Sequence, residues 1–115
     1  MNKTQVTNFL KEFMEKKRFY GILFLDNRGK NFETLAALDI RPVERERVLD
    51  SLIVEDYSEG PIPEQMYGGT EMWVFGKHVR GDEIYIKITK GRENSNTLCI
   101  SFHIAEYKMK YPFKS

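Results

Sequence analysis

The first feature of the chain is a run of apolar residues at helical spacing near its amino end. Between Thr4 and Lys17 the apolar positions fall three or four residues apart, as they do on one face of a helix. Either Thr4 or Thr7 is placed to cap the first turn. The pattern predicts a helix over residues 4–17, followed by a short, largely buried strand over the mostly aromatic and aliphatic residues 19–25.

Cap and turn signals predict two shorter helices in the middle of the chain. A turn at residues 26–29 precedes the first helix, which has Asn31 as its N-cap and ends at residue 38. Pro42 opens the second helix, in which the charged residues 44–47 form a solvated face. We expect the apolar residues of this second helix to face inward; they are Val43, Val48, Leu49 and Leu52.

The period of the apolar positions changes from 3.6 to 2 after Gly69. Before that change, two prolines and several turn-forming residues predict an ordered loop over residues 56–63. After it, polar turns at residues 80–82 and 91–96 separate three strands, which are predicted over residues 71–79, 83–90 and 97–105. Consecutive strands with short turns predict an antiparallel β-meander.

The order of these elements predicts the fold class. Helices followed by an antiparallel sheet indicate an α+β fold, with N-terminal helices packed on one face of a C-terminal β-meander. A chain of 115 residues has room for one core, and it contains no internal repeat or obvious linker. We therefore expect residues 1–115 to form a single domain.

Alternation on the last two strands assigns their side chains to two faces of the sheet. We expect one face to meet the core with an apolar set, which is Ile84, Ile86, Ile88, Leu98, Ile100, Phe102 and Ile104. The opposite face then carries a polar set, which is Glu83, Tyr85, Lys87, Thr89, Thr97, Cys99, Ser101 and His103. A phenol, an ammonium, a hydroxyl and an imidazole on one face suit acid–base work on a phosphodiester, although any exposed sheet face has to be polar.

Composition excludes several classes of protein. An apolar fraction of 41 % that includes 8 Phe and 6 Tyr argues against intrinsic disorder. The chain has no apolar run long enough to span a membrane and no apolar signal segment, so we expect a soluble, cytoplasmic protein. The lone Cys99 has no disulfide partner, and the two histidines, His78 and His103, lack metal-site spacing. The glycines form no nucleotide-binding loop, and we expect neither a metal nor a cofactor.

Basic residues gather toward the carboxyl end. Residues 1–75 carry 10 Lys/Arg against 13 Asp/Glu, a net charge of −3, whereas residues 76–115 carry 8 against 4, a net charge of +4. In residues 107–114 basic and aromatic side chains interleave, either as a surface for stacking RNA bases or as a tail that packs its rings and solvates its lysines. The three cations of the run Lys16–Arg18 have two interpretations: they complement the negative end of the helix dipole, or they form a phosphate-binding cluster.

Several short motifs follow one another in a characteristic order. They are an aspartate-aromatic loop, a tryptophan strand, a Tyr-Ile-Lys-Ile-Thr strand and an Ile-Ser-Phe strand, at Asp56-Tyr57, Met72-Trp73-Val74, residues 85–89 and residues 100–102. Their order over residues 4–103 resembles that of the MqsR-like toxins of bacterial type II toxin–antitoxin systems. The resemblance implies a RelE-like fold and a metal-independent endoribonuclease, or mRNA interferase. It also implies that mRNA is the substrate and that a cognate antitoxin, with a helix-turn-helix domain, neutralises the toxin.

The resemblance also suggests site residues. The family's catalytic tyrosine falls on Tyr85, Lys87 lies on the same strand, and His103 stands where the family has a lysine. We therefore expect these three residues to be catalytic. RNA contacts are expected from four further residues, which are Lys77, His78, Arg80 and Ser101.

Two positions depart from the family pattern. Glu59 or Ser58 takes the place of a loop lysine, and Val74 takes the place of a glutamine. Both departures favour an alternative, a non-catalytic RNA- or protein-binding module with the same fold. The extension at residues 104–115 passes the family's usual end and inherits no role from it.

Overall fold

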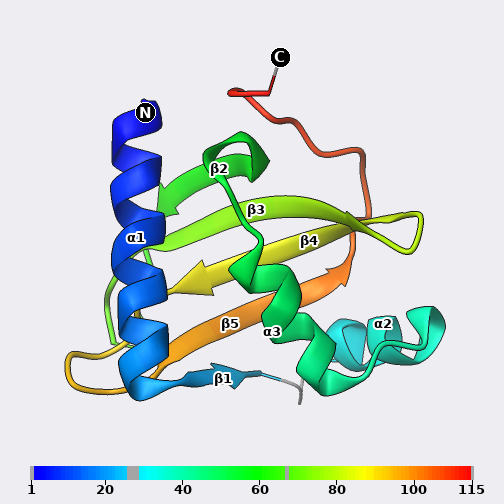
Figure 1. The fold of residues 1–115 in the computed structure, drawn as a ribbon, viewed down its shortest axis with the longest axis horizontal. Coiled ribbons are helices and arrows are strands. Elements are labelled where there is room, and N and C mark those ends of the chain that lie inside the picture. The colour runs from blue at the N-terminus through cyan, green and yellow to red at the C-terminus, as the bar shows by residue number, and fades with distance from the viewer. Residues whose placement is uncertain (1, 26–28, 67, 115) are drawn as a thin grey trace.

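The computed structural model describes residues 2–25, 29–66 and 68–114. Its helices are α1 (Lys3–Tyr20), α2 (Gly29–Leu38), α3 (Pro42–Asp50) and the 3-10 helix η1 (Val54–Asp56), and its strands are β1 (Ile22–Phe24), β2 (Tyr57–Ile62), β3 (Met72–Val79), β4 (Asp82–Thr89) and β5 (Thr97–Ile104) (Figure 1). Residues 26–28 of the predicted 26–29 turn lie outside the described residues.

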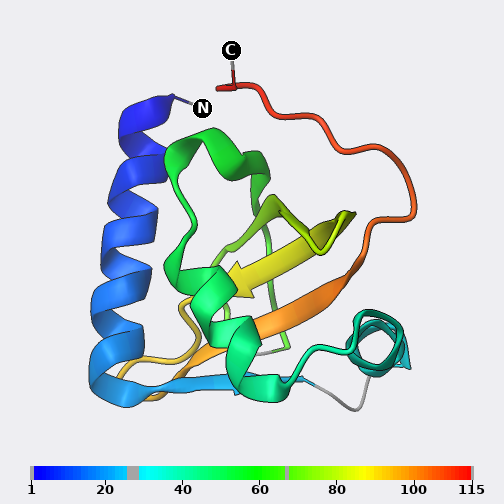
Figure 2. The ribbon, with the colours of Figure 1, turned by 45° about the vertical axis from the view of Figure 1, so that its right-hand side comes forward.

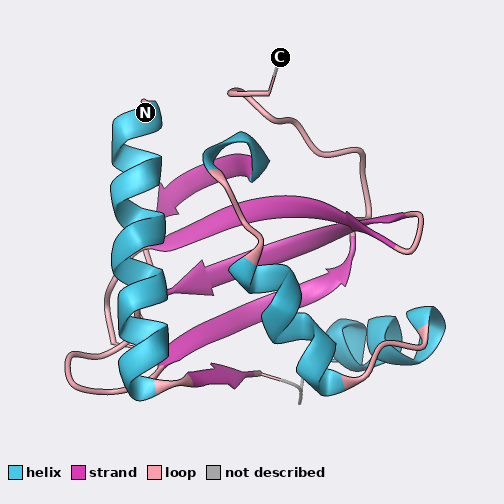
Figure 3. Ribbon diagram, viewed as in Figure 1, coloured by secondary structure: helices cyan, strands magenta, loops and turns pink. Residues whose placement is uncertain are grey.

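The strands form one mixed sheet with the order β1-β5-β4-β3-β2 (Figure 3). β1 runs parallel to β5, and the other neighbouring strands are antiparallel. Helices α1 and α3 lie over one face of the sheet, and α2 packs along β5 (Figures 1 and 2). The α+β prediction and the β3–β5 meander are confirmed, with β1 and β2 as additional edge strands.

Helix α1 extends beyond the predicted residues at both ends. Asn2, and neither threonine, is the N-cap: its side chain accepts a hydrogen bond from the Gln5 N–H at 2.9 Å, and the Gln5 side chain accepts from Asn2 N–H in return. The helix runs on to Gly21, whose φ of 82° ends it. Phe19 and Tyr20 therefore lie on the helix surface, and β1 is only three residues long.

Helix α3 faces the core differently from the prediction. Arg45 was expected in solvent, but it lies one turn before the buried Leu49 and is itself buried, with its guanidinium 4.0 Å from the centre of the Phe24 ring. Val43 was expected inside but is exposed, because it falls on the other side of the helix. Residues 57–62, predicted as loop, form the edge strand β2. An edge strand tolerates a proline because the N–H that proline lacks would have faced away from the sheet.

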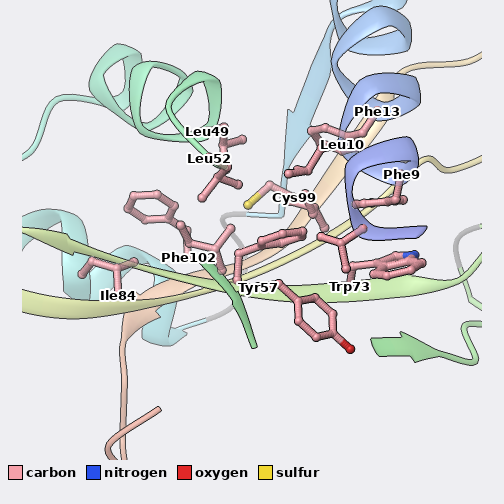
Figure 4. Close-up of a cluster of buried hydrophobic side chains, with 14 of the residues drawn as sticks. Phe9, Leu10, Phe13, Leu49, Leu52, Tyr57, Trp73, Ile84, Cys99 and Phe102 are labelled. Atoms are coloured by element: carbon pink, nitrogen blue, oxygen red, sulfur yellow. The ribbon is translucent and has the colours of Figure 1, made fainter. Parts of the chain in front are cut away.

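One cluster of buried side chains lies between α1, α3 and the sheet (Figure 4). On the helix side it contains Val6, Phe9, Leu10, Phe13, Leu49 and Leu52, and on the sheet side Trp73, Phe75, Ile84, Ile86, Ile88, Cys99 and Phe102. Phe9 stacks on Trp73 with ring centres 4.7 Å apart. Lys17 is buried beside this cluster and joins α1 to α3 through Glu46 at 3.2 Å and Asp50 at 2.8 Å.

A β-bulge in β5 changes part of the predicted face assignment. Lys87 lies opposite Ser101 but Ile88 lies opposite Cys99, so Ile100 is an extra residue in β5. Cys99 consequently joins the core, and its prediction for the polar face is wrong. Ile100 and Leu98 are buried, but both lie outside the core cluster, and Leu98 stands opposite Thr89 of the polar set, so their predicted place on the core face is wrong as well. Beyond the bulge, alternation continues through residues 101–104.

Helix α2 completes the outer edge of β5 where β1 ends. The Asn31 amide donates to the Leu25 and Ile100 carbonyls at 3.0 and 3.2 Å, and its oxygen accepts from the Phe102 N–H at 2.9 Å. The Thr34 hydroxyl accepts from the Ile104 N–H at 2.9 Å. Two helical side chains thus replace a neighbouring strand. Asn31 is not the N-cap predicted, because α2 begins two residues earlier.

We expect Asn31→Ala to destabilise the protein by about 1–3 kcal/mol for each buried backbone group that it leaves unpaired. Urea unfolding monitored by circular dichroism measures this loss. Exposed Asn8, on α1, provides the matched Asn8→Ala control, which should stay within about 0.5 kcal/mol of wild type. Equal stability of the two variants would contradict a structural role for the Asn31 amide.

Candidate functional site

A cavity of about 600 Å³ opens on the sheet face opposite the core cluster. Its floor contains Tyr85 and Lys87 from β4 and Ser101 and His103 from β5. Tyr85 lies directly opposite His103 in the register, and their rings stack with centres 5.1 Å apart and planes 11° apart. The three residues expected to be catalytic and Ser101 therefore line one cavity.

The backbone orients the His103 imidazole. Its Nδ1 lies 2.9 Å from the carbonyl oxygen of Ile104. Since a carbonyl only accepts hydrogen bonds, this contact requires the proton on Nδ1. In the neutral ring Nε2 is then the acceptor, which is the arrangement that a general base needs.

The walls of the cavity come from three other parts of the chain. Ser58 and Glu59 belong to β2, Lys30 and Asn31 belong to α2, and residues 105–109 follow β5. Charged residues of the lining are the lysines 30, 87 and 108 and the glutamates 59 and 106, and Lys30 pairs with Glu106. The cavity therefore carries a small excess of cationic groups, with one carboxylate on the β2 side.

Residues 105–114, here called the C-terminal strap, turn back from β5 toward β2 (orange to red in Figure 1). The Tyr111 hydroxyl donates to Glu83 Oε2 at 2.7 Å, and the Met109 N–H donates to Glu83 Oε1 at 3.0 Å. Phe113 stacks on Tyr57 with ring centres 5.3 Å apart. Of the two interpretations of the tail, packing is therefore correct for Tyr111 and Phe113.

Gly76 makes room for the strap on β3. A Cβ at this position would lie 2.2 Å from the Tyr111 hydroxyl oxygen, which is far inside van der Waals contact. The absence of a side chain at position 76 thus lets the Tyr111 ring pack against the sheet. The strap covers the polar sheet face next to the cavity and leaves the cavity open.

Ionisation of Glu83 is coupled to the strap. Burial alone would raise the pKa of the Glu83 carboxyl, but hydrogen bonds from Tyr111 and the Met109 N–H outweigh burial and lower it. Burial, together with the hydrogen bond to Glu83, raises the pKa of the Tyr111 phenol. The strap is thus held by an ionised carboxylate and a neutral phenol.

We expect acid to loosen the strap. Because the folded-state pKa of Glu83 is lowered, its stabilising contribution is complete above its ordinary pKa of 4.5 and is lost as the pH falls through the folded-state value. The amide resonance of Met109 should therefore titrate with a midpoint below 4.5, and Glu83→Gln should abolish that titration. A midpoint above 4.5 would show that the carboxylate does not anchor the strap.

Other expected RNA contacts lie outside the cavity. The Lys77 ammonium bonds Asp56 at 2.9 Å and the Ser51 carbonyl at 3.1 Å, on the core side of the sheet. The Arg80 guanidinium bonds the Leu38 and Asp39 carbonyls at 2.8 and 2.6 Å and Glu44 at 2.8 Å. These contacts hold α2, α3 and η1 against the β3–β4 hairpin.

The remaining expected residues are placed as follows. His78 lies opposite Glu83, on the cavity side of the sheet, but does not line the cavity. Val74, at the family's glutamine position, is fully buried. Lys16, from the cluster at the end of α1, donates to the Lys90 and Arg92 carbonyls. Lys30 and Asn31 line the cavity without having been predicted, because α2 reaches it only through its contact with β5.

The described residues contain neither a cluster of metal-ligating side chains nor a helix that could span a membrane. Within residues 2–25, 29–66 and 68–114, no group of three or more His, Cys, Asp or Glu side chains is placed to hold a metal ion. No helix among the same residues combines the length and apolar character needed to cross a membrane.

Comparison with known proteins leaves the family open. No family model matches the chain, and neither a curated protein nor a solved structure matches it. The resemblance to MqsR-like toxins therefore stays a prediction from short sequence motifs.

Proposed function

We propose that the protein is a metal-independent endoribonuclease of the mRNA interferase type. The observation that carries this proposal is the stacked pair of Tyr85 and His103 in a cavity that also holds Lys87 and Ser101. A general base, a hydroxyl acid and a cation within one cavity suit transesterification of RNA. A toxin role, with a cognate antitoxin as inhibitor, rests on the motif resemblance.

The proposed reaction needs two proton transfers. His103 Nε2 accepts the proton of a ribose 2′-hydroxyl as the O2′–phosphorus bond forms. The Tyr85 hydroxyl donates a proton to the 5′-oxygen as the phosphorus–O5′ bond breaks, which gives a 2′,3′-cyclic phosphate and a 5′-hydroxyl. The Lys87 ammonium offsets the charge on the non-bridging oxygens. DNA lacks the attacking hydroxyl and is not cleaved.

Glu59 favours a second candidate, a non-catalytic RNA- or protein-binding module. Its carboxylate lines the same cavity, where it repels a phosphate group. In this alternative the cavity binds a partner and performs no reaction.

The two candidates differ in what happens to RNA. The purified protein is incubated with matched RNA and DNA oligonucleotides in the presence of a chelator, and the products are identified by mass spectrometry. We expect cleavage of RNA alone, with 2′,3′-cyclic phosphate ends, and growth arrest when the protein is induced in a bacterial host. RNA that stays intact both with and without ribosomes, together with expression that does not slow growth of the host, would favour the binding module.

A further inference from the structure

The segment between β5 and the strap's anchor forms a turn closed at both ends by one residue. The Ala105 N–H donates to the Glu83 carbonyl at 2.8 Å, and the Met109 N–H donates to the Glu83 side chain at 3.0 Å. Residues 106–108 are thus held at the wall of the cavity by the backbone and the carboxylate of Glu83. All five residues of the turn line the cavity.

Tyr107 lies at the middle of this turn and differs from the other rings of the strap. Tyr111 and Phe113 pack against the fold, whereas Tyr107 is 85 % exposed although it borders the cavity. Its ring is therefore presented on an anchored backbone without being used for packing. A planar ring in this position offers a surface on which another planar group can stack.

Cationic groups accompany the ring. Lys108 follows Tyr107 on the cavity wall, and Lys87 lies on the floor. An aromatic platform beside cations matches the chemistry of a nucleotide in a single strand, which has a flat base and an anionic phosphate. The three lining lysines outnumber the two glutamates, which also favours a polyanion.

We propose that Tyr107 binds a base of single-stranded RNA next to the phosphodiester over Tyr85 and His103, while Lys108 contacts the neighbouring phosphate. This inference rests on the proposed function for its substrate class. It assigns to the C-terminal strap, which the motif resemblance does not cover, the role of positioning the strand over the floor of the cavity.

Binding of an uncleavable strand tests the inference separately from catalysis. The probe is a fluorescein-labelled 2′-O-methyl oligonucleotide of mixed sequence, and binding is followed by fluorescence anisotropy at fixed salt concentration. Tyr107→Ala should weaken binding by about 5- to 150-fold, the range expected for loss of one stacked base. Tyr107→Phe should bind like wild type because it keeps the ring.

Phe19→Ala is the matched control, because Phe19 is an exposed ring in the last turn of α1, outside the cavity lining. It should leave the affinity unchanged. Tyr107→Ala within twofold of wild type, or a wild-type protein that does not bind the probe, overturns the inference. Tyr107-dependent binding of the probe without cleavage of ordinary RNA would support the role of Tyr107 in binding a base and contradict the proposed endoribonuclease activity.

Discussion

Replacing Ile86 with alanine should lower the free energy of unfolding by about 2–5 kcal/mol, the range for removing a large aliphatic side chain from a packed core. Ile86 is fully buried on β4, the central strand of the sheet. Phe75 lies opposite it on β3 and Phe102 lies opposite it on β5. Both partners are themselves buried strand residues, so the lost methyl and methylene groups leave a cavity that the sheet cannot readily close.

The same substitution at Ile53 is the control. Ile53 is 53 % exposed, so Ile53→Ala should change stability by no more than about 0.5 kcal/mol. Urea unfolding measures the free energy of unfolding of both variants. The comparison holds where the slope of this free energy against urea concentration is the same as in the wild type. A loss below about 1 kcal/mol for Ile86→Ala would contradict the packing of this side chain in the core.

The meander was predictable because its signal is local. Alternation with a period of 2 places the three strands within one residue of their observed bounds, and it needs no knowledge of the partner strand. The β5 bulge was not predictable in this way, because an extra residue is defined only against the register of β4. Cys99 was therefore assigned to the wrong face, whereas Ser101 and His103, after the bulge, were not.

Contacts between distant residues account for the other differences. Asn31 is a good N-cap by type, but its amide pairs with backbone groups up to 71 residues away. The cations Lys77 and Arg80 are equally suited to phosphate and to protein partners, and their bonds to η1, α2 and α3 exist only in the folded chain. The tail composition left base stacking and packing open, and only the anchor at Glu83 distinguishes the packed Tyr111 from the exposed Tyr107.

His103→Ala should reduce RNA cleavage by about 10²–10⁴-fold, because it removes the proposed acceptor of the 2′-hydroxyl proton. Tyr85→Phe should have an effect of similar size, since it keeps the ring stacked on His103 and removes only the proposed proton donor. Initial cleavage rates with chelator present measure both losses. Relief of growth arrest in an expressing bacterial host provides a second readout.

Tyr20→Phe is the matched control for Tyr85→Phe. The Tyr20 hydroxyl donates to Asn94 at 3.1 Å, outside the cavity, so its loss should leave the cleavage rate within about twofold of wild type. Circular dichroism spectra must show that all variants are folded, because His103→Ala also removes a stacked ring. Cleavage that survives both His103→Ala and Tyr85→Phe would mean that residues other than the stacked imidazole and phenol act as base and acid.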